Sequence, residues 1–102
     1  MEHNYFKEAE KVVYYMPKDV DHHSAKTISA ELDRLIESEG IRKIVFDMEK
    51  TEFMDSSGIG IIIGRSRKLK FFNDSSVSVK NMSQRVDIIL RCSGIYSIVE
   101  KG

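Results

Sequence analysis

Residues 43–48 read Lys43-Ile44-Val45-Phe46-Asp47-Met48. This short and nearly continuous apolar run is typical of a β-strand that is buried on both faces, as in a parallel sheet. A polar loop over residues 49–55 follows it, and a glycine-containing helix then runs from Ser57 to about Phe72. A buried strand that leads through a loop into a helix is characteristic of an α/β fold.

An amphipathic helix is predicted before this strand. Apolar residues recur at helical spacing over residues 25–36, and charged residues occupy the other side. Asp21 or Ser24 is a suitable N-cap for this helix, and Gly40 stands where a C-cap belongs.

Further strands flank these segments on both sides. Lys11–Met16 is rich in β-branched and aromatic residues and predicts a strand, and Asn4–Ala9 predicts an earlier strand that pairs with it as a hairpin. Ser76–Lys80 alternates as a strand does. A third helix is expected over residues 83–94, and Ile95–Val99 is expected to form the last short strand.

The predicted order is therefore β-β-α-β-α-β-α-β in one domain that spans residues 1–102. Alternating strands and helices predict an α/β fold, with a mixed, mostly parallel sheet of four to five strands and amphipathic helices packed against it. Binding sites in such folds favour loops at the carboxyl ends of the strands.

Composition excludes several classes of function. Sixteen basic residues balance sixteen acidic ones, so we expect neither a nucleic acid nor a membrane as partner. Cys92 is the single cysteine and is expected to be a small buried hydrophobe, and no cysteine cluster suggests a zinc site. The polar start Met1–Lys11 is unlike a signal peptide, which predicts a cytoplasmic protein. A basic run predicts a solvated helix face: Arg65, Arg67, Lys68 and Lys70.

The loop and helix start after the buried strand carry the most information. Asp55, Ser56 and Ser57 place three short polar side chains at a helix N-terminus, where backbone N–H groups need acceptors. Glycine inside a helix costs roughly 1 kcal/mol relative to alanine, so some packing must compensate. Gly60 and Gly64 share one face, which predicts close packing against the sheet or against a partner backbone.

Three readings of this loop follow from its residues. The segment could be only a capped, tightly packed helix. It could be a phosphate cradle, although two serines precede the glycines and no ribose-binding acid follows. Ser56 or Ser57 could be a nucleophile, although no general base lies nearby in the sequence and the glycine pattern of a nucleophile elbow is absent.

The stretch from Phe53 to Gly60, followed by Gly64-Arg65, resembles the signature of bacterial anti-sigma factor antagonists of the STAS family. Three further landmarks agree with that resemblance over about residues 11–99. Val20-Asp21-His22-His23-Ser24-Ala25 is similar to the motif that opens the first helix of the sporulation member. Residues 41–48 match its central strand, and Ser93-Gly94-Ile95 matches a step near its C-terminus.

The resemblance implies a regulatory binding module, not an enzyme. In this family the first serine after the aspartate is phosphorylated, which is Ser56 here. The unphosphorylated protein binds an anti-sigma factor that is a serine kinase, and thereby releases a sigma factor. Phosphorylation ends the binding, and a serine phosphatase reverses it. ATP and magnesium belong to the kinase, so the chain itself needs no cofactor.

We expect the kinase to contact residues around Ser56. Asp21 and Asp55 would flank the serine, although Asp21 could equally be only a helix cap. Adjacent histidines, His22 and His23, point in different directions and lack a third ligand, so no metal site is expected. The predicted partner-binding residues are Asp21, His22, Asp55, Ser57, Gly58, Ile59 and Arg65.

An alternative function stays open at this point. The chain could be the STAS module of another signalling assembly that binds a nucleotide or small ligand at the same loop. We further expect a monomer, with no catalytic residues of its own.

Overall fold

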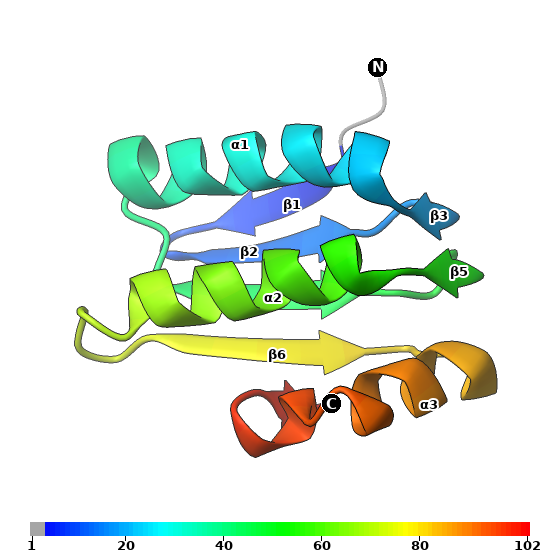
Figure 1. Cartoon of the computed structure of the whole chain (residues 1–102). Coiled ribbons are helices and arrows are strands. Elements are labelled where there is room, and N and C mark those ends of the chain that lie inside the picture. Colours follow the sequence, from blue (N-terminus) through cyan, green and yellow to red (C-terminus); the bar gives the residue numbers. More distant parts are fainter. Residues whose placement is uncertain (1–3) are drawn as a thin grey trace.

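The computed structural model describes residues 4–102 (Figure 1); residues 1–3 of the polar stretch Met1–Lys11 lie outside the described part. A hairpin opens the chain, with β1 over Tyr5–Glu8 antiparallel to β2 over Lys11–Tyr15. Parallel strands β4 (Lys43–Asp47), β6 (Ser76–Lys80) and β7 (Glu100–Lys101) follow in the sheet order β1-β2-β4-β6-β7. The predicted mixed, mostly parallel sheet and α/β fold are therefore confirmed.

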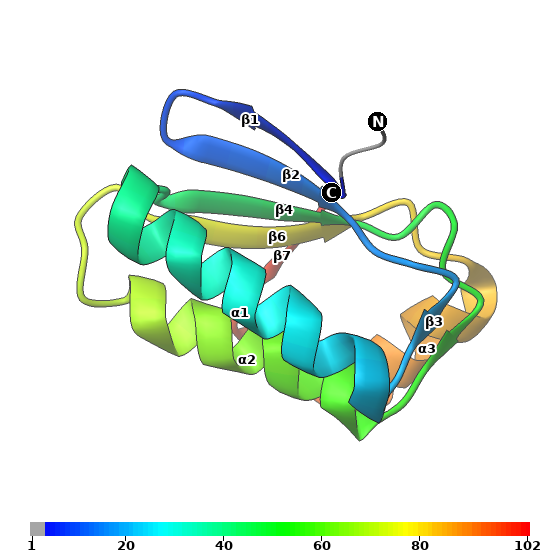
Figure 2. The ribbon, with the colours of Figure 1, turned by 90° about the horizontal axis from the view of Figure 1, so that it is seen from above.

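Two helices cover one face of this sheet and lie side by side (Figure 2). They are α1 over His22–Glu39 and α2 over Ser56–Leu69. The strands turn alternate residues toward them, so Val12, Ile44 and Phe46 are fully buried. At Gly40 the chain adopts a left-handed φ of 69°, which ends α1 at the predicted glycine.

A second, two-stranded ribbon lies outside the main sheet, at the amino-terminal ends of both helices (Figure 1). It pairs β3 (Asp19–Val20) with β5 (Phe53–Met54) in parallel. We predicted residues 49–55 as a loop throughout, and that prediction is wrong for Phe53 and Met54. Two-residue strands leave no periodicity in a sequence, so this pairing could not be recognised there.

The predicted strand Ile95–Val99 is also wrong. Ile95–Ser97 forms a 3₁₀ turn, η1, after α3 (Gln84–Cys92), and β7 begins only at Glu100. The backbone N–H groups of Ile98 and Val99 both donate to the Ile95 carbonyl, at 3.0 Å. Ile95 and Val99 are buried while Ser97 between them is exposed, which breaks the alternation that a strand would show.

Cys92 is exposed and free, so the prediction of a buried thiol is wrong. The buried residues of α3 are Val86 and Leu90. Cys92 follows Leu90 by two positions, which is about 200° around a helix of 3.6 residues per turn. Its side chain therefore points away from the core.

Gly58 is the glycine that permits close packing, not Gly60 or Gly64. A methyl group on Gly58 would collide with the Met54 side chain, whose sulfur would lie at 2.9 Å, and would stand 3.0 Å from Val20 Cγ1. Gly60 and Gly64 have no atom within 4 Å of that position, so the predicted packing of these two against the sheet is wrong. The first turn of α2 rests directly on the β3–β5 ribbon because Gly58 lacks a side chain.

Gly58→Ala and Gly60→Ala are therefore expected to change stability in opposite directions. Gly60→Ala should stabilise the protein by up to about 1 kcal/mol through helix propensity alone. Gly58→Ala should destabilise it by about 1 kcal/mol net, because the strain of the added methyl group outweighs the higher helix propensity of alanine. Urea unfolding of both variants checks this. Equal stabilisation by both changes would contradict the packing role of Gly58.

Candidate functional site

The β3–β5 pairing brings two helix starts together. Val20 pairs with Met54, and the backbone N–H of Asp55 donates to the Val20 carbonyl at 3.2 Å. The residues that follow the two strands, Asp21 after β3 and Asp55 after β5, are the N-caps of α1 and α2. Both predicted aspartates therefore lie at one end of the molecule, with the amino-terminal ends of both helices beside them (Figure 1).

Ser56 is the first residue of α2 and is exposed. The Asp55 carboxylate accepts a hydrogen bond from the Ser57 backbone N–H at 2.8 Å, which fixes the first turn of the helix. Among residues 4–102 no hydrogen bond engages the Ser56 hydroxyl. Its side chain is therefore open to solvent at a position where the helix backbone favours negative charge.

Asp21 makes a capping box at the start of α1. Its carboxylate accepts from the backbone N–H groups of His23 and Ser24, each at 3.0 Å, while the Ser24 hydroxyl accepts from the Asp21 backbone at 3.0 Å. The prediction that Asp21 caps the helix is confirmed. A contact between Asp21 and a partner stays a prediction.

The histidines that follow are exposed, and their rings meet edge to face with centroids 5.4 Å apart. In the described part of the chain, no group of three histidine, cysteine, aspartate or glutamate side chains is placed to hold a metal ion. Over the same residues, no helix is both long enough and apolar enough to cross a membrane.

Apolar side chains lie exposed close to Ser56. Phe53, three residues earlier on β5, is 46% exposed, and Ile59 is partly buried against the core. Ile88 of α3, a helix that contacts β5, is 49% exposed. Gly60 lies one helical turn beyond Ser56 and is exposed. The surface beside the serine is thus partly apolar, and sequence reasoning missed Phe53 and Ile88 because large apolar residues are ordinarily expected to be buried.

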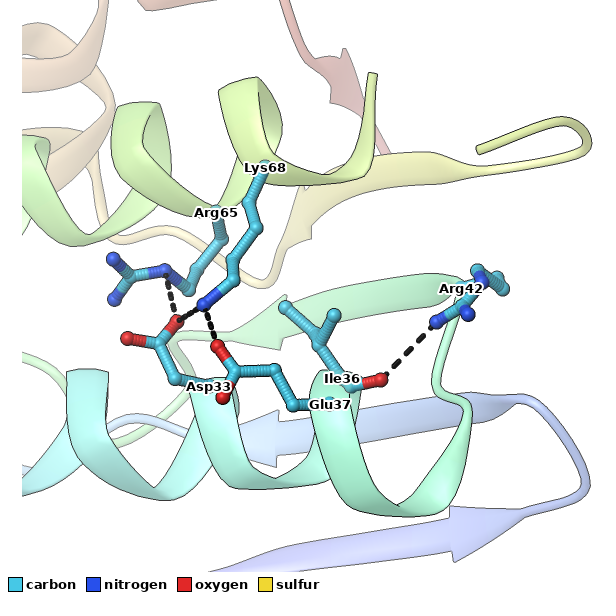
Figure 3. Close-up of polar contacts among 6 residues, drawn as sticks. All are labelled: Asp33, Ile36, Glu37, Arg42, Arg65 and Lys68. Carbon is cyan, nitrogen blue, oxygen red and sulfur yellow. Dashed lines mark hydrogen bonds and ion pairs between the residues drawn. The ribbon is translucent and has the colours of Figure 1, made fainter. Parts of the chain in front are cut away.

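Arg65 and Gly58, both predicted to touch a partner, have intramolecular contacts in this structure. Gly58 is buried against Met54 and Val20. Arg65 lies only 14% exposed between the helices, with its Nε 3.2 Å from the Asp33 carboxylate (Figure 3). Their contact with a partner stays a prediction.

Arg65 belongs to a cluster of charges that joins α1 to α2. Lys68 pairs with Asp33 at 3.3 Å and with Glu37 (Figure 3). Among the described residues the buried Arg65 Nε and Asp33 Oδ1 lack hydrogen bonds, so their contact is a charge pair without good hydrogen-bond alignment. The prediction of a solvated basic face is therefore wrong for Arg65 and Lys68, which are paired with α1.

The Asp21 cap should make stability depend on pH. Hydrogen bonds from the backbone of Ser24 and then of His23 hold the pKa of this carboxyl below its ordinary value. Because the folded-state pKa lies below the unfolded one, the stabilisation is complete above the unfolded pKa and is lost as pH falls through the folded value. Asp21→Ser keeps an uncharged cap acceptor, so its stability should change less over this acidic range. Urea unfolding from acid to neutral pH checks this, with Asp21→Ala as the variant that loses the cap at every pH. An unchanged pH slope in Asp21→Ser would contradict the prediction.

Comparison with known proteins agrees with this geometry. The family model of the STAS domain matches residues 6–101. An anti-sigma F factor antagonist of Paenibacillus polymyxa is 31% identical over 81 residues, which cover 79% of this chain and 68% of the relative. Another, from Lysinibacillus sphaericus, is 36% identical over 61 residues, which cover 60% of this chain and only 52% of that relative.

Solved structures give the same picture. The anti-sigma factor antagonist SpoIIAA in its unphosphorylated form superposes with a TM-score of 0.76 at 25% identity, over 95% of this chain and 83% of that one. The Bacillus cell fate determinant SpoIIAA in its phosphorylated form gives 0.75 at 27% identity, over 95% and 86%. With a family model that covers nearly the whole sequence and a fold shared from β1 to β7, this chain belongs to the STAS domain family.

Proposed function

We propose that this protein is an anti-sigma factor antagonist of the SpoIIAA type. In this proposal it binds an anti-sigma factor that is a serine kinase, in the cytoplasm, and phosphorylation of Ser56 ends the binding. The observation that carries the proposal is the exposed Ser56 at the first position of α2, in a chain similar to antagonists of which one is known in a phosphorylated form.

The acceptor geometry supports the transfer of phosphate to Ser56. Its hydroxyl oxygen would attack the γ-phosphorus of ATP held by the kinase, forming a new O–P bond while the bond to the ADP oxygen breaks. The kinase takes up the hydroxyl proton. The chain supplies only the acceptor and is not itself an enzyme, and a serine phosphatase restores the hydroxyl with water.

The fold should tolerate the phosphate. A phosphoserine carries about −1.5 to −2 charges near neutral pH, and the positive end of a helix stabilises such an anion. The Asp55 carboxylate is held on the Ser57 N–H and stays close by, and Asp21 begins the neighbouring helix. The added charge therefore joins an acidic surface, and its main effect falls on a partner that was packed against a neutral hydroxyl.

Ser56→Ala and Ser57→Ala distinguish the two candidate serines. The chain is incubated with Mg-ATP and the anti-sigma serine kinase of the same genome, and phosphate is located by intact and peptide mass spectrometry. We expect one phosphate on Ser56 in the wild type and in Ser57→Ala, since the Ser57 backbone N–H still binds Asp55. Ser56→Ala should take up none. Calorimetry before and after phosphorylation should show affinity falling by about a hundredfold, or about 2.7 kcal/mol.

An active kinase that leaves both serines unmodified would contradict the antagonist proposal. That outcome favours the alternative of a STAS module in another signalling assembly. Phosphate on Ser57 alone would retain the switch but refute its assignment to Ser56.

Gly60→Gln tests the surface beside Ser56. Apart from the helix's own backbone and the chain neighbours, no atom lies within 4 Å of a Cβ built there, so we expect the fold to be preserved and its stability not to fall. A long side chain one turn from Ser56 should weaken kinase binding at least about tenfold by holding the partner away from the helix. Ser38→Gln is the matched control, because Ser38 is exposed near the C-terminus of α1 and the candidate site lies at the N-termini of the helices. Equal affinities for both variants would show that the kinase does not dock on this face of α2.

A further inference from the structure

A cavity of about 660 Å³ lies where β2 and β4 end and α1 begins, and Ser56 is not part of its lining. Its lining comes from residues at the ends of these strands and from the first turns of α1, and it includes no residue of 51–60. Figure 2 shows that the chain leaving β2 passes over this end of the molecule toward β3 and α1. Ligand sites of α/β folds are usual at the carboxyl ends of strands, and this volume is within their usual range.

Polar and charged side chains line one part of the cavity, and apolar and aromatic side chains line the rest. Tyr14, Met16 and Ile28 are almost fully buried and form part of its lining. The Tyr14 hydroxyl is already engaged, since it donates to the Glu31 carboxylate at 2.7 Å. Tyr15 is 43% exposed, and its hydroxyl has no hydrogen bond among the described residues.

Asp47 is the buried charge in this lining, with only 8% of its surface exposed. Its Oδ1 accepts hydrogen bonds from the Glu49 N–H at 3.0 Å and from the Asn81 amide at 3.1 Å. Among residues 4–102 its Oδ2 accepts none, and no cation lies within ion-pair distance. Lys80 is the neighbour of Asp47 on β6, yet its ammonium forms no ion pair with that carboxylate.

The ring of Tyr15 and the carboxylate of Asp47 are neighbours. They occupy paired positions on the parallel strands β2 and β4, so both side chains are on the same face of the sheet. Glu49 adds a second carboxylate without an ion pair to the lining, against one exposed cation, Lys50.

The Asp47 carboxylate accepts hydrogen bonds only from neutral donors, and an incoming ammonium group would add the stronger, charge-assisted kind. An aromatic ring face attracts the same group. From this combination we propose that the cavity binds a small organic cation, an amine whose charged head meets Asp47 and Tyr15 and whose apolar body extends past the ends of β2 and β4 toward Met16. The site is separate from Ser56, so its test and that of the partner switch are independent.

Nuclear magnetic resonance of the ¹⁵N-labelled full chain tests the proposal with three probes of similar shape: phenethylamine, 2-phenylethanol and phenylacetate. Phenethylamine should give saturable shifts at the amides of Tyr15, Thr27 and Asp47, with an affinity of about millimolar for so small a molecule. The neutral alcohol should bind about tenfold more weakly and phenylacetate should not bind.

Variants separate charge from shape. Asp47→Asn keeps an oxygen acceptor for the Glu49 N–H and should weaken phenethylamine binding about tenfold. Thr27→Trp fills the cavity from the exposed side of α1 without changing charge and should abolish binding. Glu8→Gln, on exposed β1, is the control for loss of a surface carboxylate, and it and Ser56→Ala should both bind as the wild type does.

Three outcomes would overturn the proposal. The first is the absence of saturable shifts with phenethylamine. The second is binding of phenylacetate as tight as that of the amine. The third is wild-type affinity in both Asp47→Asn and Thr27→Trp, which are read together so that a folding defect in one does not decide the result.

Discussion

The short parallel pairing of β3 with β5 determines where the site is. Only two residues from each strand pair, Asp19 with Phe53 and Val20 with Met54, yet both α1 and α2 begin at the residues that follow. The ribbon thereby ties together two helix N-termini that are far apart in the sequence. Its contact with α2 depends on Gly58, because any side chain there would displace the first turn that presents Ser56. The position of the serine is therefore set by packing behind it, not by contacts of its own.

Two separate features hold the helices parallel behind that ribbon. Apolar side chains from both helices cover the buried rows of β2, β4 and β6, and this burial supplies most of the stabilisation, at roughly 25 cal/mol for each Å² of apolar surface. On the outer side, Asp33 and Glu37 pair with Arg65 and Lys68. The partly exposed pairs that Lys68 makes contribute little each, about 0–1 kcal/mol, and the gain from the buried Arg65–Asp33 contact is offset by the cost of desolvating both charges. Their effect is on the alignment of α1 with α2 more than on total stability.

Long periodic segments were predictable from the sequence and short or exposed features were not. Residues 25–36 have a helical period, and residues 43–48 form a short apolar run that suits a buried strand. The caps Asp21 and Gly40 are residues of the required chemistry. The β3–β5 ribbon was missed because two residues make no period. Residues 95–99 were misread because an apolar run does not distinguish a strand from a turn with buried positions four apart.

In the candidate site, too, some features were predictable from the sequence and others were not. Asp55, Ser56 and Ser57 could be found because short polar residues at a helix start have a local meaning. The glycines after them could not be sorted by sequence, since Gly58 packs inside the protein while Gly60 and Gly64 face open space. A glycine inside a helix lowers stability by roughly 1 kcal/mol relative to alanine, and at Gly60 no packing contact within the protein compensates for this loss. The missing side chain would instead let a partner approach the helix closely. Gly60 lies one turn from the serine that this partner must reach.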